Sequence, residues 1–220
     1  MLKILIILLI VFMYKMFKGT RIDFKSFFKK GLEPLDDRHS VWVCHGRQGS
    51  GKNYVSIYEL LRQDKKIVNK VKTNIHSLKI KDYKIEYFTK IDEIYMDTEE
   101  HCIYVIDEIS RKYDKNSRTD TQFYAWLNQC RKRKRIVILI TQEWKELPMW
   151  LRRPVKYSFT TKPFGPKFLH LFRTFIGDAE NMFLEPTTLE WECPIIGSFI
   201  YKRNKSIADL YDTFEPINSL

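Results

Sequence analysis

Short runs of apolar residues alternate along the chain with stretches in which apolar positions recur every three or four residues. The runs, which are rich in Val and Ile, cover residues 41–44, 102–106 and 136–140, and the more polar residues 67–75 are a further predicted strand. Runs of this length that end in polar or glycine-rich segments are typical of strands buried on both faces of a parallel sheet. Helical spacing follows Lys52 and returns from Phe123 to Cys130. The alternation predicts an α/β fold with a largely parallel central sheet flanked by helices.

Weaker patterns predict the smaller elements. Residues 83–88 form a predicted strand, and Thr89 is expected to cap a short helix that holds Ile91 and Ile94. Residues 111–120 are polar and aperiodic, which predicts a mobile loop. Beyond position 142 the predicted elements are edge strands or a small hairpin at 155–161 and 168–175, a last strand at 195–201 and a short capped helix at 206–211.

The first apolar run leads directly into a glycine-rich loop. The loop and the start of the next helix contain Gly46, Arg47, Gln48, Gly49, Ser50, Gly51, Lys52 and Asn53. This spacing predicts a P-loop, in which backbone N–H groups surround a polyphosphate and the lysine reaches the β- and γ-phosphates. A plain glycine turn is the alternative, but the strand before the loop and the helix after it favour the P-loop. Asn53 stands where a Ser or Thr hydroxyl would bind Mg²⁺, and its amide oxygen is a weaker ligand.

Polar side chains follow two further apolar runs. Asp107, after residues 102–106, is predicted to hold Mg²⁺ through water, and Glu108 to orient or deprotonate the water that attacks ATP. Gln142, after residues 136–140, is predicted to sense the γ-phosphate or to position water, although polarity at a strand end is an equal alternative. The predicted cofactors are therefore ATP and Mg²⁺.

Composition indicates an ordered, basic protein. Apolar residues make up 44% of the chain and aromatic residues 15%, which excludes global disorder. The net charge of +11 implies a polyanionic partner, either nucleic acid or an anionic membrane. The four cysteines and five histidines are scattered, so no zinc site is expected and the thiols are predicted to be reduced.

The positive charge is densest after the predicted helix at 123–130. That segment reads Arg131, Lys132, Arg133, Lys134 and Arg135. Neutralising a helix dipole accounts for one or two of these residues. We predict that Lys132, Arg133, Lys134 and Arg135 bind DNA phosphates and that Arg131 completes the nucleotide site of a neighbouring subunit. The aromatic residues beyond position 142 stack bases or form a second small core, and the core is favoured.

The amino-terminal segment is predicted to be a membrane anchor. Residues 4–14 are continuously apolar, and extension to residue 17 with Lys3 and Lys15 at the interfaces gives a short transmembrane helix. A signal peptide and a buried core helix are the alternatives. Basic residues after position 14 place the amino terminus outside and the rest in the cytoplasm. The predicted division is an anchor at 1–18, a basic juxtamembrane linker at 19–39, an ATPase domain at 40–213 with an accessory part at 143–213, and a tail at 214–220.

Taken in order, these motifs resemble the zonula occludens toxin-like family of filamentous-phage assembly ATPases, within the wider group of DNA-pumping P-loop ATPases. The matching segments are residues 41–53, 72–75, 104–108, 126–131, 138–142 and 211–213, so the resemblance spans about 40–213. It implies a RecA/FtsK-like P-loop NTPase fold in which Lys52 binds phosphate, Asp107 binds metal and Glu108 activates water. It further implies that Gln142 is the sensor and Arg131 acts across a subunit boundary.

The resemblance implies a membrane-anchored ATPase that moves viral DNA, single-stranded in our prediction, during virion assembly or extrusion. The expected partners are further copies of the chain in a ring, predicted to be hexameric, viral DNA, a host or viral membrane, and other assembly or capsid proteins. Packaging of double-stranded DNA into a membrane-containing virus is the nearest alternative. An alternative of another class is a membrane scaffold that binds nucleotide with little hydrolysis, which Asn53 favours, and a non-viral signalling NTPase is a third.

Overall fold

A computed structural model describes residues 6–7, 10–11, 14, 20–22, 39–64, 68, 70–81, 83–166 and 169–212. Most of the predicted anchor and linker, and the predicted tail, lie outside these residues. No helix in the described part of the chain is long and apolar enough to cross a membrane. The anchor therefore stays a prediction.

One mixed sheet organises the fold, and its nine strands run in the order β1-β11-β8-β7-β2-β6-β5-β3-β4. The central strands are β2 (Val41–His45), β6 (Ile136–Thr141), β5 (Cys102–Ile106), β3 (Lys70–Thr73) and β4 (Lys84–Tyr87). These strands and β7 (Val155–Phe164) run parallel to one another. Beyond β7, β8 (Leu171–Asp178) pairs antiparallel with β7, and β11 (Ile195–Lys202) pairs antiparallel with β8. Strand β1 (Thr20–Ile22) pairs parallel with β11 at the edge. The prediction of a largely parallel central sheet is confirmed.

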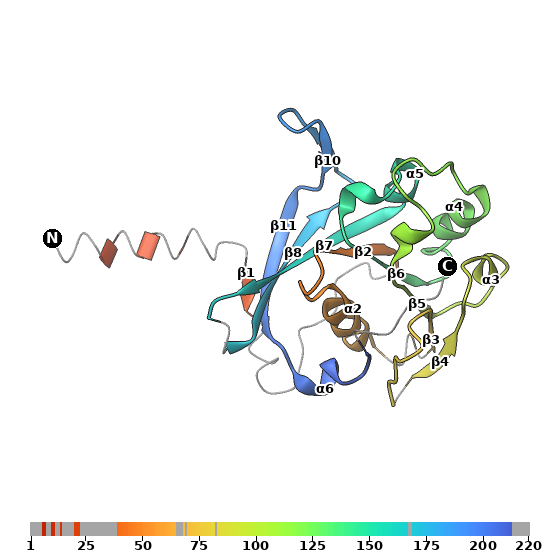
Figure 1. Cartoon of the computed structure of the whole chain (residues 1–220), viewed down its shortest axis with the longest axis horizontal. Helices are drawn as coiled ribbons and strands as arrows, with labels where there is room; N and C mark the ends of the chain where they lie inside the picture. Colours follow the sequence, from red (N-terminus) through yellow and green to blue (C-terminus); the bar gives the residue numbers. More distant parts are fainter. Residues whose placement is uncertain are drawn as a thin grey trace.

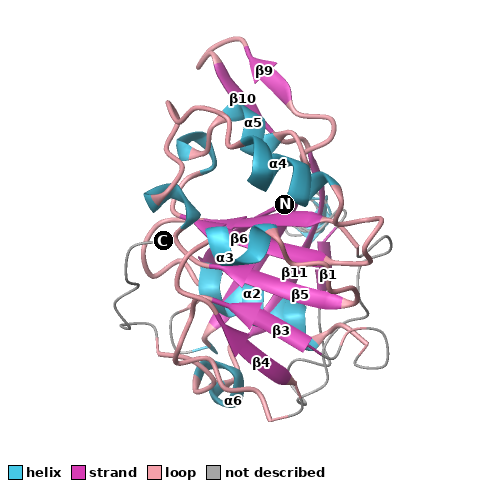
Figure 2. Ribbon diagram, turned by 90° about the vertical axis from the view of Figure 1, so that its right-hand side faces the viewer, coloured by secondary structure: helices cyan, strands magenta, loops and turns pink. Residues whose placement is uncertain are grey.

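Helices cover both faces of the sheet (Figure 1). Helix α2 (Lys52–Leu61) and the short α6 (Lys205–Ala208) lie on one face, and α3 (Asp92–Tyr95), α4 (Thr121–Asn128) and α5 (Met149–Arg152) lie on the other (Figures 1 and 2). Strands β2, β5 and β6 send alternate side chains into the two layers, so their apolar runs are buried throughout. That two-sided burial explains why these strands show no alternation in the sequence.

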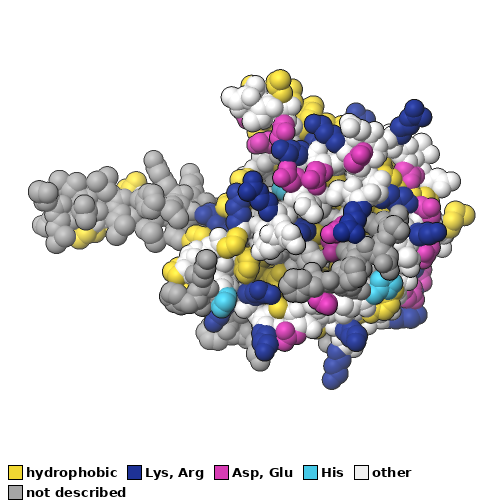
Figure 3. Space-filling view, viewed as in Figure 1, with side chains coloured by type: hydrophobic (Ala, Val, Ile, Leu, Met, Phe, Trp, Pro, Cys, Tyr) yellow, Lys and Arg dark blue, Asp and Glu magenta, His cyan; other side chains and the backbone are white. Residues whose placement is uncertain are grey.

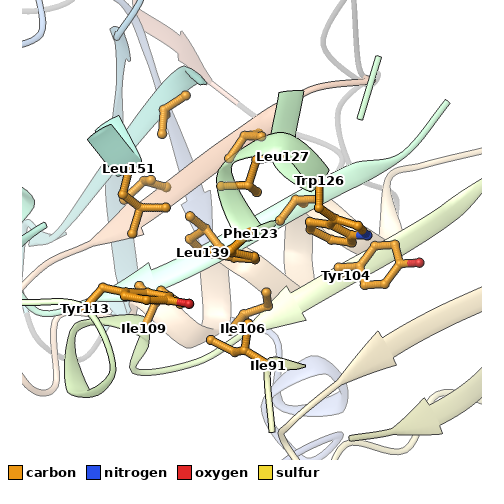
Figure 4. Packing of buried hydrophobic residues seen from close by; sticks show 14 of the residues in the cluster. Ile91, Tyr104, Ile106, Ile109, Tyr113, Phe123, Trp126, Leu127, Leu139 and Leu151 are labelled. Atoms are coloured by element: carbon orange, nitrogen blue, oxygen red, sulfur yellow. The ribbon is translucent and has the colours of Figure 1, made fainter. Parts of the chain in front are cut away.

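Helix α4 seals one face of the sheet. Asp120 caps it by accepting a hydrogen bond from the backbone nitrogen of Phe123 at 3.0 Å. Phe123, Trp126 and Leu127, which the helical spacing predicted as its buried face, pack on the strands beneath (Figure 4). The predicted helix with one buried face is confirmed.

Several smaller predictions need correction. Thr89 does not cap α3, because the helix begins after Ile91 and receives no side-chain cap. Helix α6 is shorter than the predicted 206–211 helix, and Asn204 caps it through a hydrogen bond from the backbone nitrogen of Ser206. Trp144 and Trp150 are buried, as favoured, but they join the main core on the α4 face instead of forming a second one.

The hairpin of β9 (Phe183–Glu185) and β10 (Glu190–Glu192) was not foreseen. It projects from the body of the molecule, and hydrophobic and acidic side chains gather on it (Figures 1 and 3). The indole Nε1 of Trp144 donates a hydrogen bond of 3.1 Å to the carbonyl of Trp191, which ties the hairpin to the body.

Candidate nucleotide site

The glycine-rich loop connects β2 to α2 at the carboxyl end of the parallel strands. Its first residue, Gly46, donates its backbone N–H to the carbonyl of Gln142 at 2.9 Å. Gly51 has φ +94° and ends the loop immediately before Lys52 opens the helix. A side chain at Gly51 would be strained in that conformation and would also lie 3.0 Å from the ring of Phe172. The loop therefore has the strand–loop–helix setting that a P-loop requires.

Asp107 lies at the end of β5, and its side chain faces the start of α2. The amide Nδ2 of Asn53 donates a hydrogen bond of 2.7 Å to Asp107 Oδ2. The backbone N–H of Glu108 donates to the other carboxylate oxygen at 2.8 Å. The structure thus joins the glycine-rich loop and the acidic strand end, 54 residues apart, through one direct contact.

Asn74, at the end of β3, fixes the backbone of the same aspartate. Its Nδ2 donates to the carbonyl of Asp107 at 3.0 Å, and its Oδ1 accepts from the backbone N–H of Asp107 at 2.8 Å. Residues 72–75 stood out in the sequence only as part of a family resemblance, and Asn74 was not among the predicted site residues. A polar residue at the end of a strand next to β5 was the available signal.

Burial controls the protonation of this aspartate. The Asp107 side chain is removed from water, and that desolvation raises its pKa to about 6, although the hydrogen bond from Asn53 opposes the rise. A nearby cation favours the ionised form of such a carboxylate. Within the described residues no cluster of three or more His, Cys, Asp or Glu could hold a metal. Mg²⁺ at phosphate sites needs only one or two protein ligands, so Asp107 and the amide oxygen of Asn53 fit it.

Glu108 does not point into an open site in this structure. Its backbone adopts a left-handed conformation with φ +53°, which is uncommon for a residue with a side chain. Its carboxylate forms an ion pair with the guanidinium of Arg111, three residues later. The predicted water-activating group is therefore next to the predicted metal ligand in the chain but engaged elsewhere.

Gln142 lies between the two halves of the site, because β6 separates β2 from β5 in the sheet. Its side chain is exposed and lines a cleft of about 1020 Å³ that begins at Gly46 and reaches the β10 hairpin. His45 lies on the floor of this cleft, with Nε2 2.9 Å from Ser158 Oγ and 2.9 Å from Thr160 Oγ1. Burial lowers the pKa of His45 to about 4. His45 was also not among the predicted site residues.

The basic run lies at the opposite end of the sheet. Residues 131–135 precede β6, whose length places them about 17 Å from the glycine-rich loop. Arg131 therefore cannot complete the site of its own chain, and its action on a neighbour stays a prediction. Lys132 and Lys134 are exposed, and Arg133 is partly buried. Their binding to DNA also stays a prediction.

Arg135 is not a DNA ligand, and that prediction is wrong. The residue is 1% exposed. Its guanidinium donates hydrogen bonds to the carbonyls of Glu99 at 2.7 Å and Asp97 at 2.6 Å. It also lies over the rings of Tyr104 and Trp126. These contacts satisfy a buried cation, so Arg135 supports the fold beneath β5 and β6.

The sheet topology and the strand–loop–helix setting of the glycine-rich loop are those of the P-loop NTPase fold. No protein-family model and no curated protein matches the sequence. Among solved structures, the N-terminal domain of zonular occludens toxin from Neisseria meningitidis matches with a TM-score of 0.56 at 19% identity, over 80% of this chain and 100% of that one. The genome packaging NTPase from Sulfolobus turreted icosahedral virus 2, in complex with sulfate, matches with a TM-score of 0.51 at 14% identity, over 73% and 99%.

The same viral NTPase in complex with AMPPCP matches with a TM-score of 0.51 at 12% identity, over 76% of this chain and 98% of that one. These likenesses establish the fold. The resemblance inferred from the sequence motifs is thereby confirmed at the level of fold.

Proposed function

We propose that this protein is an ATPase that moves viral DNA during virion assembly. The observation that carries the proposal is the contact between Asn53 and Asp107, which brings the phosphate-binding loop and an acidic strand end into one site. Solved structures that share the fold are a zonular occludens toxin domain and a viral genome packaging NTPase. The net charge of +11 suits a nucleic-acid partner.

Each residue of the site has a role in this proposal. The backbone of residues 46–51 and the ammonium of Lys52 bind the polyphosphate of ATP. Asp107 and Asn53 hold Mg²⁺, which supplies charge neutralisation at the phosphates. Glu108 accepts a proton from the attacking water, and Gln142 orients that water. Arg131 of a neighbouring copy completes the site in a ring of subunits.

Turnover of the full chain in detergent micelles tests the proposal. ATP hydrolysis should rise on addition of DNA, and it should be lost in Lys52→Ala and in Glu108→Gln. Greater stimulation by single-stranded DNA supports extrusion, whereas greater stimulation by duplex DNA supports packaging. Tight nucleotide binding without turnover under all of these conditions would establish the scaffold alternative instead, and turnover indifferent to DNA would favour a signalling NTPase.

We further propose that residues 1–18 anchor the chain in the host inner membrane or a viral membrane with the ATPase domain in the cytoplasm. The continuous apolar run and the basic residues after it support this orientation. A cysteine placed at position 2 should react with an impermeant thiol reagent added outside intact cells. Reaction from the cytoplasmic side alone would refute the orientation.

A further inference from the structure

A basic loop follows Glu108 at the same end of the sheet as the glycine-rich loop. Residues 111–118 include Arg111, Lys112, Lys115 and Arg118 against a single acidic residue, Asp114. The loop begins at the 3₁₀ turn Ile109–Arg111, directly after the left-handed Glu108. Positive charge is therefore concentrated within a few residues of the carboxylate that activates water in the proposed function.

The body of the molecule holds this loop in place. Tyr113 is buried beneath the loop, and its hydroxyl donates to Asp120 Oδ2 at 2.6 Å. The indole Nε1 of Trp150 donates to the carbonyl of Ser117 at 3.2 Å. A turn between Asp114 and Ser117 forms the outer part of the loop, and the backbone N–H of Ser117 donates to the carbonyl of Asp114 at 3.0 Å. The predicted loop is thus anchored, which allows it to present its cations at fixed positions.

The cations of the loop differ in their partners. Lys112 forms an ion pair with Asp92 at 2.5 Å, and Arg111 pairs with Glu108. Lys115 and Arg118 are exposed, and within the described residues no ion pair involves them. Two cations without an acidic partner, on an anchored loop, form a surface suited to an anion with repeated charges.

We propose that residues 111–118 bind nucleic-acid phosphates and that a bound phosphate competes with Glu108 for Arg111. Lys115 and Arg118 hold the DNA backbone on the loop. Arg111 then exchanges the carboxylate oxygen for a phosphate oxygen, which its guanidinium also binds through a charge-assisted hydrogen bond. The released Glu108 becomes available to accept a proton from water. DNA binding therefore raises turnover by freeing a positioned group.

The inference rests on the proposed ATPase function and assigns it a DNA site and a means of coupling. Arg111 acts through Glu108 and is a positioning residue. The Arg111 side chain is 54% exposed and that of Glu108 24%, so solvent screens their pair. A screened pair of this kind limits the gain in free Glu108 to about 2- to 5-fold.

The test compares ATP turnover of the full chain in detergent micelles with and without DNA. Arg111→Gln should raise kcat without DNA by about 2- to 5-fold, leave the KM for ATP unchanged, and reduce the further stimulation by DNA. Arg111→Lys retains the charge and should behave nearly as the wild type. Loss of folding cannot produce a gain in turnover, so a rise separates this role from a structural one. An unchanged or lower kcat in Arg111→Gln would overturn the coupling.

DNA binding by the loop is measured separately, through the salt dependence of the affinity. Lys115→Gln combined with Arg118→Gln should weaken binding and lower the slope of log K against log salt by about 1.4 to 1.8, the loss expected for two phosphate contacts. The matched control is Lys81→Gln combined with Lys90→Gln, which removes the same charge beside β4 and should leave the slope unchanged. Equal slopes for wild type and the loop variant would overturn the site.

These outcomes also separate the inference from the proposed function. A wild-type chain that shows no turnover with any DNA refutes the ATPase function, and the salt slopes then still decide whether the loop binds DNA. Stimulation of turnover by anionic vesicles but not by DNA would overturn a nucleic-acid site in favour of a lipid one.

Discussion

The contact between Asn53 and Asp107 predicts a pH-dependent loss of stability in Asn53→Asp. The substitution puts a carboxylate oxygen where the amide Nδ2 lies, 2.7 Å from Asp107 Oδ2. Two unit charges at that separation repel by about 6 kcal/mol at an effective dielectric constant near 20. Binding one proton between the two carboxylates costs less free energy than this repulsion, so the folded variant takes up a proton that restores the hydrogen bond.

The size of the loss follows from the free energy of binding that proton. A carboxyl group with an ordinary pKa near 3.9 costs about 1.4 kcal/mol to protonate for each pH unit above that value. The largest expected loss of stability in Asn53→Asp is therefore about 4 kcal/mol at pH 7 and about 1.5 kcal/mol at pH 5. The positive charge of Lys52 favours ionised carboxylates here and lowers both figures. Because the folded state holds a proton that the unfolded state has released, the variant loses stability as pH rises.

Urea unfolding of the full chain in detergent, without nucleotide and with EDTA, measures this loss at pH 5, 6 and 7. Asn128→Asp, at an exposed position, is the control and should show no comparable dependence on pH. Mg²⁺ added at pH 7 should restore much of the stability of Asn53→Asp, because a divalent cation replaces the shared proton. A loss of equal size at all three pH values would refute the reasoning, since it would mean that the two side chains do not share a proton.

Three further substitutions test the fold and the site. Arg135→Met removes two hydrogen bonds from a buried guanidinium and should lower the free energy of unfolding by about 2–4 kcal/mol. Lys132→Met, at an exposed position, should change it by less than about 0.5 kcal/mol, and chemical unfolding compares the two variants. Gly51→Ala should lower the free energy of unfolding by about 1–3 kcal/mol, because the new side chain is strained at φ +94° and meets the ring of Phe172. It should also weaken nucleotide binding, measured by calorimetry. Both effects should be larger than those of Gly49→Ala, whose side chain meets open space. Burial lowers the pKa of His45 to about 4, so the unfolded chain takes up a proton here at a higher pH than the folded chain does. The wild type should therefore lose about 2 kcal/mol of stability as the pH falls from 7 to 5. His45→Gln should remove that part of the pH dependence in unfolding titrations.

The central sheet could be predicted because its strands are marked by composition alone. The runs that became β2, β5 and β6 are apolar at every position, since each strand is buried on both faces. The glycine-rich loop was equally readable, because close approach to a phosphate demands glycine at set positions. The carboxyl ends of parallel strands meet at one edge of a sheet, so the grouping of Asp107 and Gln142 near the loop followed from topology.

The edges of the fold could not be predicted in this way. Strand β1 is three residues long and pairs with β11, 178 positions away in the register Thr20↔Ser198. The β9–β10 hairpin is two three-residue strands with exposed apolar side chains, so no burial pattern marks it. Pairings of this kind depend on tertiary position, and local sequence carries little of that information.

Neighbouring residues of the basic run differ in exposure, and the packing of the fold decides which of them face solvent. Lys134 is exposed, whereas Arg135, the next residue, is buried between two rings with its guanidinium on backbone carbonyls. The chain turns between them, with Lys134 in a left-handed conformation at φ +52°. Because a side chain's direction reverses at the start of a strand, a run of like charges is not evidence of a continuous basic surface.

Both carboxylates of the site are engaged within the chain, and this has a consequence for turnover. Asp107 accepts hydrogen bonds from Asn53 and from the backbone of Glu108, and Glu108 pairs with Arg111. In a site built in this way, the internal contacts compete with the contacts that the ligands would make. The exchange at Asn53 would follow binding of Mg²⁺, and the exchange at Arg111 would follow binding of DNA. Under the proposed function, turnover should therefore be fastest with both ligands present, and DNA added to the chain with Mg²⁺ should raise it by about 2- to 5-fold, as expected from release of Glu108.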